Sequence, residues 1–192
     1  MKLPLKSSSL QETALPPFSG VGTIFLCDVV DFKVPNDGVD SVALAREMNG
    51  VFAGIHECIR ELGGLIVSST GDAVLAVWGP SFVAPSHAEL ALACGRKILE
   101  RLQKGSENSK FSYSLRIILA TGQLDGRSVG GRFQVFGQPL AVAKRLEALQ
   151  ISKHSQILCT SETLACIPTG NSSDPIGQIK GAEGNDVMVY AF

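Results

Sequence analysis

The chain has 192 residues and a formal net charge of −1, with 45% hydrophobic and 18% charged residues. This composition suits one well-buried globular domain, and it gives no electrostatic case for nucleic acid or an anionic membrane as a partner. No apolar window approaches the ~20 residues of a membrane span, and the five cysteines do not pair closely, so we expect a cytoplasmic protein with reduced thiols and no membrane association.

The N-terminal segment differs from the rest of the chain in composition. Residues 1–19 are rich in serine and proline and show no hydrophobic period, which predicts a flexible leader. The remaining residues contain no internal repeat. We therefore expect one folded domain at 20–192.

Along this domain, apolar β-rich runs predict strands, and apolar positions at helical spacing predict helices. The expected elements are a strand at 21–28, a helix at 39–62, a hairpin at 65–67 and 73–78, a helix at 85–104, strands at 111–120 and 132–136, a helix at 139–149, a strand at 156–159, a helical turn at 161–165 and a closing hairpin at 176–180 and 187–192. The glycines of 122–131 predict a loop or arm. This order predicts an α+β fold, a ferredoxin-like βαββαβ core with additional C-terminal strands and helices packed on one sheet face.

Two carboxylates stand at the ends of predicted strands. Asp28 follows the first apolar run, and Asp72 lies at the Gly71-Asp72 tip of the first hairpin. Ordinary turn and strand-end roles are the alternative for both residues. Because Mg²⁺ and Mn²⁺ prefer oxygen ligands and keep room for substrate phosphates, the pattern favours a divalent metal site here.

Five sequence blocks occur in a set order: FLCDVVDF, SSTGDAVLAVWG, LRIILATG, QVFGQPLAVAKRL and IKGAEGNDVMVYAF. In this order and spacing they resemble the class III nucleotide cyclase catalytic domain, the adenylate and guanylate cyclase homology domain, from about residue 20 to the C-terminus. The resemblance implies the class III cyclase fold and a phosphorus-oxygen lyase. Such an enzyme converts a nucleoside triphosphate into a 3′,5′-cyclic nucleotide and pyrophosphate, and its homodimer forms the active sites at the subunit interface.

The resemblance also assigns residues to the metal site. Asp28 and Asp72 match the two metal-binding aspartates, with the backbone carbonyl of Val29 as a further ligand. Two Mn²⁺ or Mg²⁺ ions per active site would activate the ribose hydroxyl and stabilise the leaving pyrophosphate. Phe32, in the same block as Asp28, is a candidate for substrate binding.

Three basic residues match family positions that contact phosphate. Arg116 lies in an otherwise apolar strand and matches the arginine of the family's R-x-G-I-H-T-G strand. Lys180 matches the lysine of the C-terminal V-K-G block, and Arg145 matches the transition-state arginine on the helix after the V-x-G turn. The alternatives are a core ion pair for Arg116 and solvated surface charges for the other two.

Three positions depart from the family pattern. Ser68 replaces the lysine that reads the purine edge in adenylate cyclases, Gln134 replaces its Asp or Thr partner, and Ala141 replaces the transition-state asparagine. Gln138, one helical turn before Ala141, is a hypothetical substitute donor. The Gln134 amide can pair with uracil, with cytosine or with adenine, and Ser68 can add one bond, so both are candidate substrate-binding residues unless they simply fill space.

These departures leave several functions open. The pattern is similar to the pyrimidine cyclases, class III relatives that make cyclic UMP or cyclic CMP in bacterial antiphage defence. We therefore expect UTP as the substrate, with CTP next and an adenylate cyclase as the alternative. A catalytically silent nucleotide-binding or dimerisation module is the competing class, because Ala141 and Ser68 remove functional groups. A diguanylate cyclase is set aside because the chain has no G-G-D/E-E-F hairpin.

Overall fold

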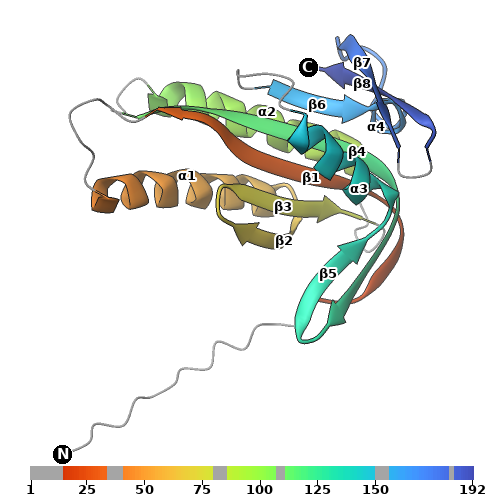
Figure 1. Ribbon diagram of the computed structural model, residues 1–192, viewed down its shortest axis with the longest axis horizontal. Coiled ribbons are helices and arrows are strands. Elements are labelled where there is room, and N and C mark those ends of the chain that lie inside the picture. Colours follow the sequence, from red (N-terminus) through yellow and green to blue (C-terminus); the bar gives the residue numbers. More distant parts are fainter. Residues whose placement is uncertain (1–14, 34–40, 80–85, 107–110, 150–155, 182–183) are drawn as a thin grey trace, which may run out of the picture.

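The computed structural model describes residues 15–33, 41–79, 86–106, 111–149, 156–181 and 184–192 (Figure 1). Helices and strands follow in the predicted order. They are β1 (Phe18–Lys33), α1 (Ser41–Glu61), β2 (Leu65–Thr70), β3 (Ala73–Trp78), α2 (His87–Ser106), β4 (Ser112–Val129), β5 (Arg132–Phe136), α3 (Gln138–Ala148), β6 (Gln156–Thr160), α4 (Ser161–Ala165), β7 (Asp174–Lys180) and β8 (Asp186–Ala191).

The described strands form one sheet in the order β2-β3-β1-β4-β6-β8-β7, with β5 paired to β4 outside this path. β1 and β4 are the long central strands and run antiparallel, and β6 is parallel to β4. The first four strands have the order β2-β3-β1-β4, which is that of a ferredoxin-like core, and β6 to β8 extend the sheet. The predicted α+β fold with additional C-terminal strands is therefore confirmed.

Helices cover both faces of this sheet, so the expectation that they pack on one face is wrong. α1 and α2 pack on one face, where Phe25 and Ile117 join the same core cluster. α3 packs on the other face together with Ile24 and Ile118. The apolar runs of β1 and β4 show no alternation with polar residues, because both faces of these central strands are buried.

The β2–β3 hairpin is anchored below α1 by Trp78. Its indole Nε1 donates to the carbonyl of Leu62 at 2.8 Å, and its ring packs against Phe25 with centroids 5.4 Å apart. The hairpin turns at Gly71, whose φ of 62° lies in the left-handed region that glycine adopts freely. The tip of the hairpin therefore has the sharp geometry that the sequence predicts.

The segment expected as a loop at 122–131 is mostly strand. β4 continues to Val129, and the turn at Gly130-Gly131, both with positive φ, leads back into β5. This two-stranded ribbon projects beyond the sheet (Figure 1). Phe18 lies over Gly126, where a Cβ would overlap the phenylalanine ring, so the glycine permits close packing at the base of the ribbon.

The N-terminal strand begins inside the segment expected as a leader. β1 starts at Phe18, which is buried, while residues 1–14 lie outside the described part of the chain. A domain boundary at residue 20 stays a prediction. None of the described helices is both long enough and apolar enough to cross a bilayer.

Candidate functional site

Asp28 lies in β1, and Asp72 lies beside it in the turn that precedes β3, at one end of the β1–β3 pair. The register pairs Asp28 with Ala73, and the backbone N–H of Val29 donates to the carbonyl oxygen of Asp72 at 2.9 Å. Asp28 is buried in β1, whereas Asp72 is exposed at the hairpin tip. The fold therefore brings together the two carboxylates that the sequence singled out.

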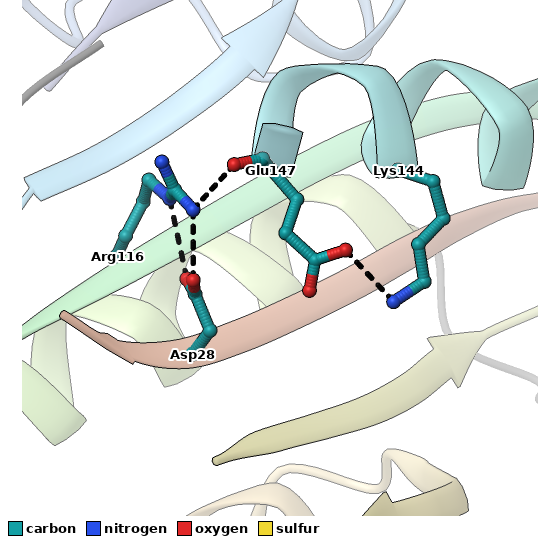
Figure 2. Close-up of polar contacts among 4 residues, drawn as sticks. All are labelled: Asp28, Arg116, Lys144 and Glu147. Carbon is teal, nitrogen blue, oxygen red and sulfur yellow. Dashed lines mark hydrogen bonds and ion pairs between the residues drawn. The ribbon is translucent and has the colours of Figure 1, made fainter. Parts of the chain in front are cut away.

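Arg116 lies directly opposite Asp28 in the β1–β4 register and forms a forked ion pair with it. The Nη2 and Nε groups of Arg116 donate to Oδ2 and Oδ1 of Asp28 at 2.8 and 3.3 Å (Figure 2). The same Nη2 donates to the backbone carbonyl of Glu147 in α3 at 2.6 Å. Arg116 was expected to contact phosphate or to form a core ion pair, and its described contacts are those of a core ion pair. Its contact with phosphate stays a prediction.

The charges around Asp28 oppose one another. Burial raises the pKa of Asp28, the ion pair with Arg116 counteracts this rise, and the nearby negative charges of Glu147 and Asp72 add to it. A site in which negative groups repel one another is stabilised by a cation. Electrostatics therefore favour a second positive charge beside Asp28 and Asp72.

The donor atoms fit a hard divalent cation. Asp28 and Asp72 supply carboxylate oxygens, and in the described part of the chain no group of three or more acidic, histidine or cysteine side chains could hold a metal. Mg²⁺ is commonly bound through one or two carboxylates, with water and substrate phosphates as the other ligands. Two aspartates thus fit an ion that is shared with a nucleotide, and the carbonyl of Val29 stays a predicted ligand.

Glu147 and Lys144 of α3 belong to the surroundings of this site but were not predicted from the sequence. The ammonium of Lys144 lies 2.9 Å from the Glu147 carboxylate, and Figure 2 shows both residues on α3 beside Asp28 and Arg116. Their proximity depends on how α3 packs across β1 and β4. No local motif could have indicated it.

Arg145, in the last turn of α3, and Lys180, at the end of β7, form a second group. Nη1 of Arg145 donates to the backbone carbonyls of Lys180 and Gly181 at 2.5 and 2.6 Å. These hydrogen bonds hold α3 against the start of the segment that links β7 to β8. The ammonium of Lys180 extends into solvent and lies 2.7 Å from Asp186. The structure brings these two predicted phosphate ligands together, and no described contact joins them to Asp28 or Asp72.

The predicted base-reading residues lie on two strands that contact each other. Ser68 is exposed on β2, next to a register shift, and Gln134 is exposed on β5. Neither side chain has a described contact with Asp28 or Asp72, so their role in base reading stays a prediction. Phe32 lies in β1, but its side chain is outside the described part of the chain.

The hypothetical donor Gln138 points toward the β7–β8 turn. Its Nε2 lies 3.5 Å from Oδ1 of Asn185, a long hydrogen bond on an exposed surface. Ala141 follows on the same helix and contributes no polar side-chain atom. The proposed substitution of Gln138 for the missing asparagine therefore stays a hypothesis.

Comparison with known proteins adds the family context. The family model described as the adenylate and guanylate cyclase catalytic domain matches residues 15–190. Adenylate cyclase 1 of Rhizobium meliloti is 24% identical over 178 residues, which cover 88% of this chain and 27% of that protein. The chain thus spans about a quarter of the length of the curated relatives it matches.

Two solved structures have a similar fold. The adenylyl cyclase CyaB from P. aeruginosa superposes with a TM-score of 0.75 at 21% identity, covering 92% of this chain and 95% of that chain. The non-canonical dimeric guanylyl cyclase domain of the RhoGC fusion protein from Blastocladiella emersonii also gives 0.75, at 22% identity, covering 92% and 97%. At these identities the structural likeness concerns the fold.

Proposed function

Because this chain belongs to the adenylate and guanylate cyclase catalytic domain family, we propose that it converts a nucleoside triphosphate into its 3′,5′-cyclic monophosphate and pyrophosphate. The observation that supports this activity best is the placement of Asp28 in β1 beside Asp72 in the turn that precedes β3. Neither aspartate alone is diagnostic. Together they provide the oxygen ligands that such a reaction needs.

Asp28 and Asp72 are the residues that would hold the divalent ions, two in each active site. When bound, Mg²⁺ or Mn²⁺ supplies Lewis-acid activation of the 3′-hydroxyl and neutralises charge on the triphosphate. Arg116 lies within hydrogen-bond distance of Asp28 and has the planar donor set that matches a phosphate. Arg145 and Lys180 would contribute positive charge at a second group of phosphate contacts.

The substrate we propose is a purine nucleoside triphosphate. The relatives with a printed activity are adenylate and guanylate cyclases, and none of the comparisons supports the pyrimidine specialisation or antiphage role expected from Ser68 and Gln134. A glutamine amide also pairs with the adenine edge, so Gln134 is compatible with ATP. The named relatives thus favour ATP or GTP over UTP.

We also propose that the active protein is a homodimer. No described contact joins the metal group around Asp28 to the phosphate group around Arg145, and a second copy would complete each site. One of the similar structures is described as a dimeric guanylyl cyclase domain. A dimer would place the two groups of one active site on different subunits.

The direct test is turnover by the purified protein with Mn²⁺ and each of ATP, GTP, UTP and CTP, with products resolved by mass. We expect a cyclic purine nucleotide and pyrophosphate. Asp72→Ala should abolish the product, and the exposed control Asp174→Ala should not. A cyclic pyrimidine product would refute the proposed substrate but would support the cyclase reaction.

A catalytically silent module is the second candidate, and two observations favour it. The carboxylate of Asp28 is already occupied by Arg116, and Ala141 provides no donor toward developing charge. Loss of one such donor typically slows an enzyme about 10²–10³-fold without silencing it. Nucleotide binding without turnover of any of the four triphosphates would support the silent module.

A further inference from the structure

In the forked ion pair, the Arg116 guanidinium binds the carboxylate of Asp28 that is proposed to hold the metal ion. Both carboxylate oxygens of Asp28 accept hydrogen bonds from the guanidinium, and the two side chains point toward each other from adjacent strands (Figure 2). Arg116 and Asp28 are only 3% and 7% exposed. Water therefore screens this pair weakly, and the positive charge of Arg116 acts at short range on any cation that approaches Asp28.

Arg116 is held in this position by more than Asp28. Its Nη2 also donates to the backbone carbonyl of Glu147, at the C-terminal end of α3. The carboxylate of Glu147 is engaged by Lys144, so it is not free to replace Asp28 as the partner of the guanidinium. An anion that accepts these hydrogen bonds would allow Arg116 to leave Asp28 without stranding its buried charge.

One part of the guanidinium is unused. Nη1 of Arg116 is buried and has no hydrogen-bond partner among the described residues. Unpartnered buried donors are uncommon, and their presence indicates strain, a functional role or a missing partner. Because phosphate oxygens match the planar fork of a guanidinium, an entering phosphate can accept from Nη1 as the bonds to Asp28 are given up.

We propose that the Arg116–Asp28 ion pair makes divalent-metal binding conditional on the triphosphate. Without nucleotide, Arg116 neutralises Asp28 and repels the ion. When a triphosphate enters, Arg116 exchanges the carboxylate for phosphate oxygens, and Asp28 becomes available to the metal. This inference rests on the proposed function, because it assumes that a triphosphate and a divalent ion meet at Asp28 and Asp72.

The test is calorimetric titration of the purified full chain with Mn²⁺ alone, and with 3′-deoxyATP or 3′-deoxyGTP in the presence and absence of Mn²⁺. These nucleotides lack the attacking hydroxyl, so binding is measured without turnover. For the wild type we expect weak binding of Mn²⁺ alone and at least tenfold tighter nucleotide binding with Mn²⁺. By linkage, the same factor describes how far nucleotide tightens Mn²⁺.

Arg116→Met removes the competing charge and retains an apolar side chain of similar length. It should bind Mn²⁺ alone at least tenfold more tightly than the wild type, and Mn²⁺ should raise its melting temperature more. The matched control is Arg127→Met, because Arg127 lies on the same strand in an exposed pair with Asp125. The control should bind Mn²⁺ as the wild type does.

Each outcome bears on the inference. Unchanged affinity of Arg116→Met for Mn²⁺ alone would overturn it and leave the proposed function intact. Absence of Mn²⁺-dependent nucleotide binding in the wild type would overturn both. If Arg116→Met does not fold, Arg116→Gln replaces it, because glutamine removes the charge and keeps a hydrogen-bond donor. Tighter binding of Mn²⁺ alone by Arg116→Gln supports the inference, and unchanged binding contradicts it.

Discussion

Asp28 and Asp72 are assigned the same chemical role, yet the structure places them in different environments. Asp28 is buried and paired with Arg116, whereas Asp72 is exposed at a hairpin tip. Asp28→Ala would leave the guanidinium of Arg116 buried without its carboxylate. Asp72→Ala would remove a side chain that has no described hydrogen bond or ion pair. Both changes should abolish turnover, but only Asp28→Ala should strongly destabilise the fold.

The magnitudes follow from burial. Breaking a buried ion pair by removing one partner costs about 3–5 kcal/mol, because an uncompensated charge stays inside the protein. An exposed substitution away from such features changes stability by about 0.5 kcal/mol or less. For a chain of this size, 1 kcal/mol shifts the melting temperature by roughly 2–4 °C. Asp28→Ala should therefore lower the melting temperature by roughly 6–20 °C, and Asp72→Ala by no more than about 2 °C.

The assay is thermal and denaturant unfolding of the two variants without metal or nucleotide, so that ligand binding does not contribute to stability. The double variant Asp28→Leu with Arg116→Met provides the internal control. Because apolar replacement of a whole buried ion pair is often neutral or stabilising, the double variant should recover most of the loss. It should recover no turnover.

Two results would refute this reasoning. Equal melting temperatures for Asp28→Ala and Asp72→Ala would show that the ion pair contributes little in the folded protein. A double variant as unstable as Asp28→Ala would show that the loss arises from something other than the stranded charge of Arg116. Either result would also weaken the competition inferred between Arg116 and a metal ion.

Three further predictions concern other regions. Burial lowers the pKa of His87, so the folded protein disfavours its protonation. The stability that comes from neutral His87 should be fully present above the unfolded pKa of about 6.5 and should fall as the pH drops below it. His87→Gln should flatten this pH dependence in denaturant titrations. Gly54→Ala should stabilise the fold by about 1 kcal/mol, because a Cβ there meets open space beside a cavity of about 360 Å³. Gly22→Ala should destabilise it by about 1–3 kcal/mol, because its Cβ would lie 2.8 Å from the backbone oxygen of Trp78. Thermal unfolding measures both changes. Arg145→Lys should reduce turnover by about 10²–10³-fold with little change in nucleotide affinity, since lysine keeps the charge but lacks the planar set of donors that matches a phosphate. An unchanged rate would contradict a transition-state role.

Local signals account for the parts of the fold that the sequence predicted well. The helix at 39–62 and the hairpin tip at Gly71-Asp72 depend on hydrophobic period and turn chemistry within a few residues. The strand at 132–136 and the helical turn at 161–165 match the structure residue for residue. Turn geometry also placed Asp72 correctly, because the positive φ of Gly71 is a local requirement.

Long-range packing accounts for what the sequence did not predict. The expected loop at 122–131 became strand because β4 continues along β1 beyond Gly122, and a partner strand outweighs the weak strand propensity of glycine. The apolar runs of β1 and β4 are typical of strands buried on both faces, whereas the predicted fold has helices on one face alone. The contact between Arg116 and Asp28 joins residues 88 positions apart, so only the β1–β4 register determines it.

The ion pair at Asp28 does not by itself separate a catalytic site from a structural one, because a buried carboxylate needs a positive partner in either case. The surroundings of Asp72 are what distinguish a catalytic site from a structural one. Its charge raises the pKa of Asp28, which means that it repels the other carboxylate, and its side chain has no described hydrogen bond or ion pair that offsets this repulsion. A cation that binds both carboxylates would offset this repulsion. In the proposed function, a divalent cation bound between Asp28 and Asp72 would turn this repulsion into attraction.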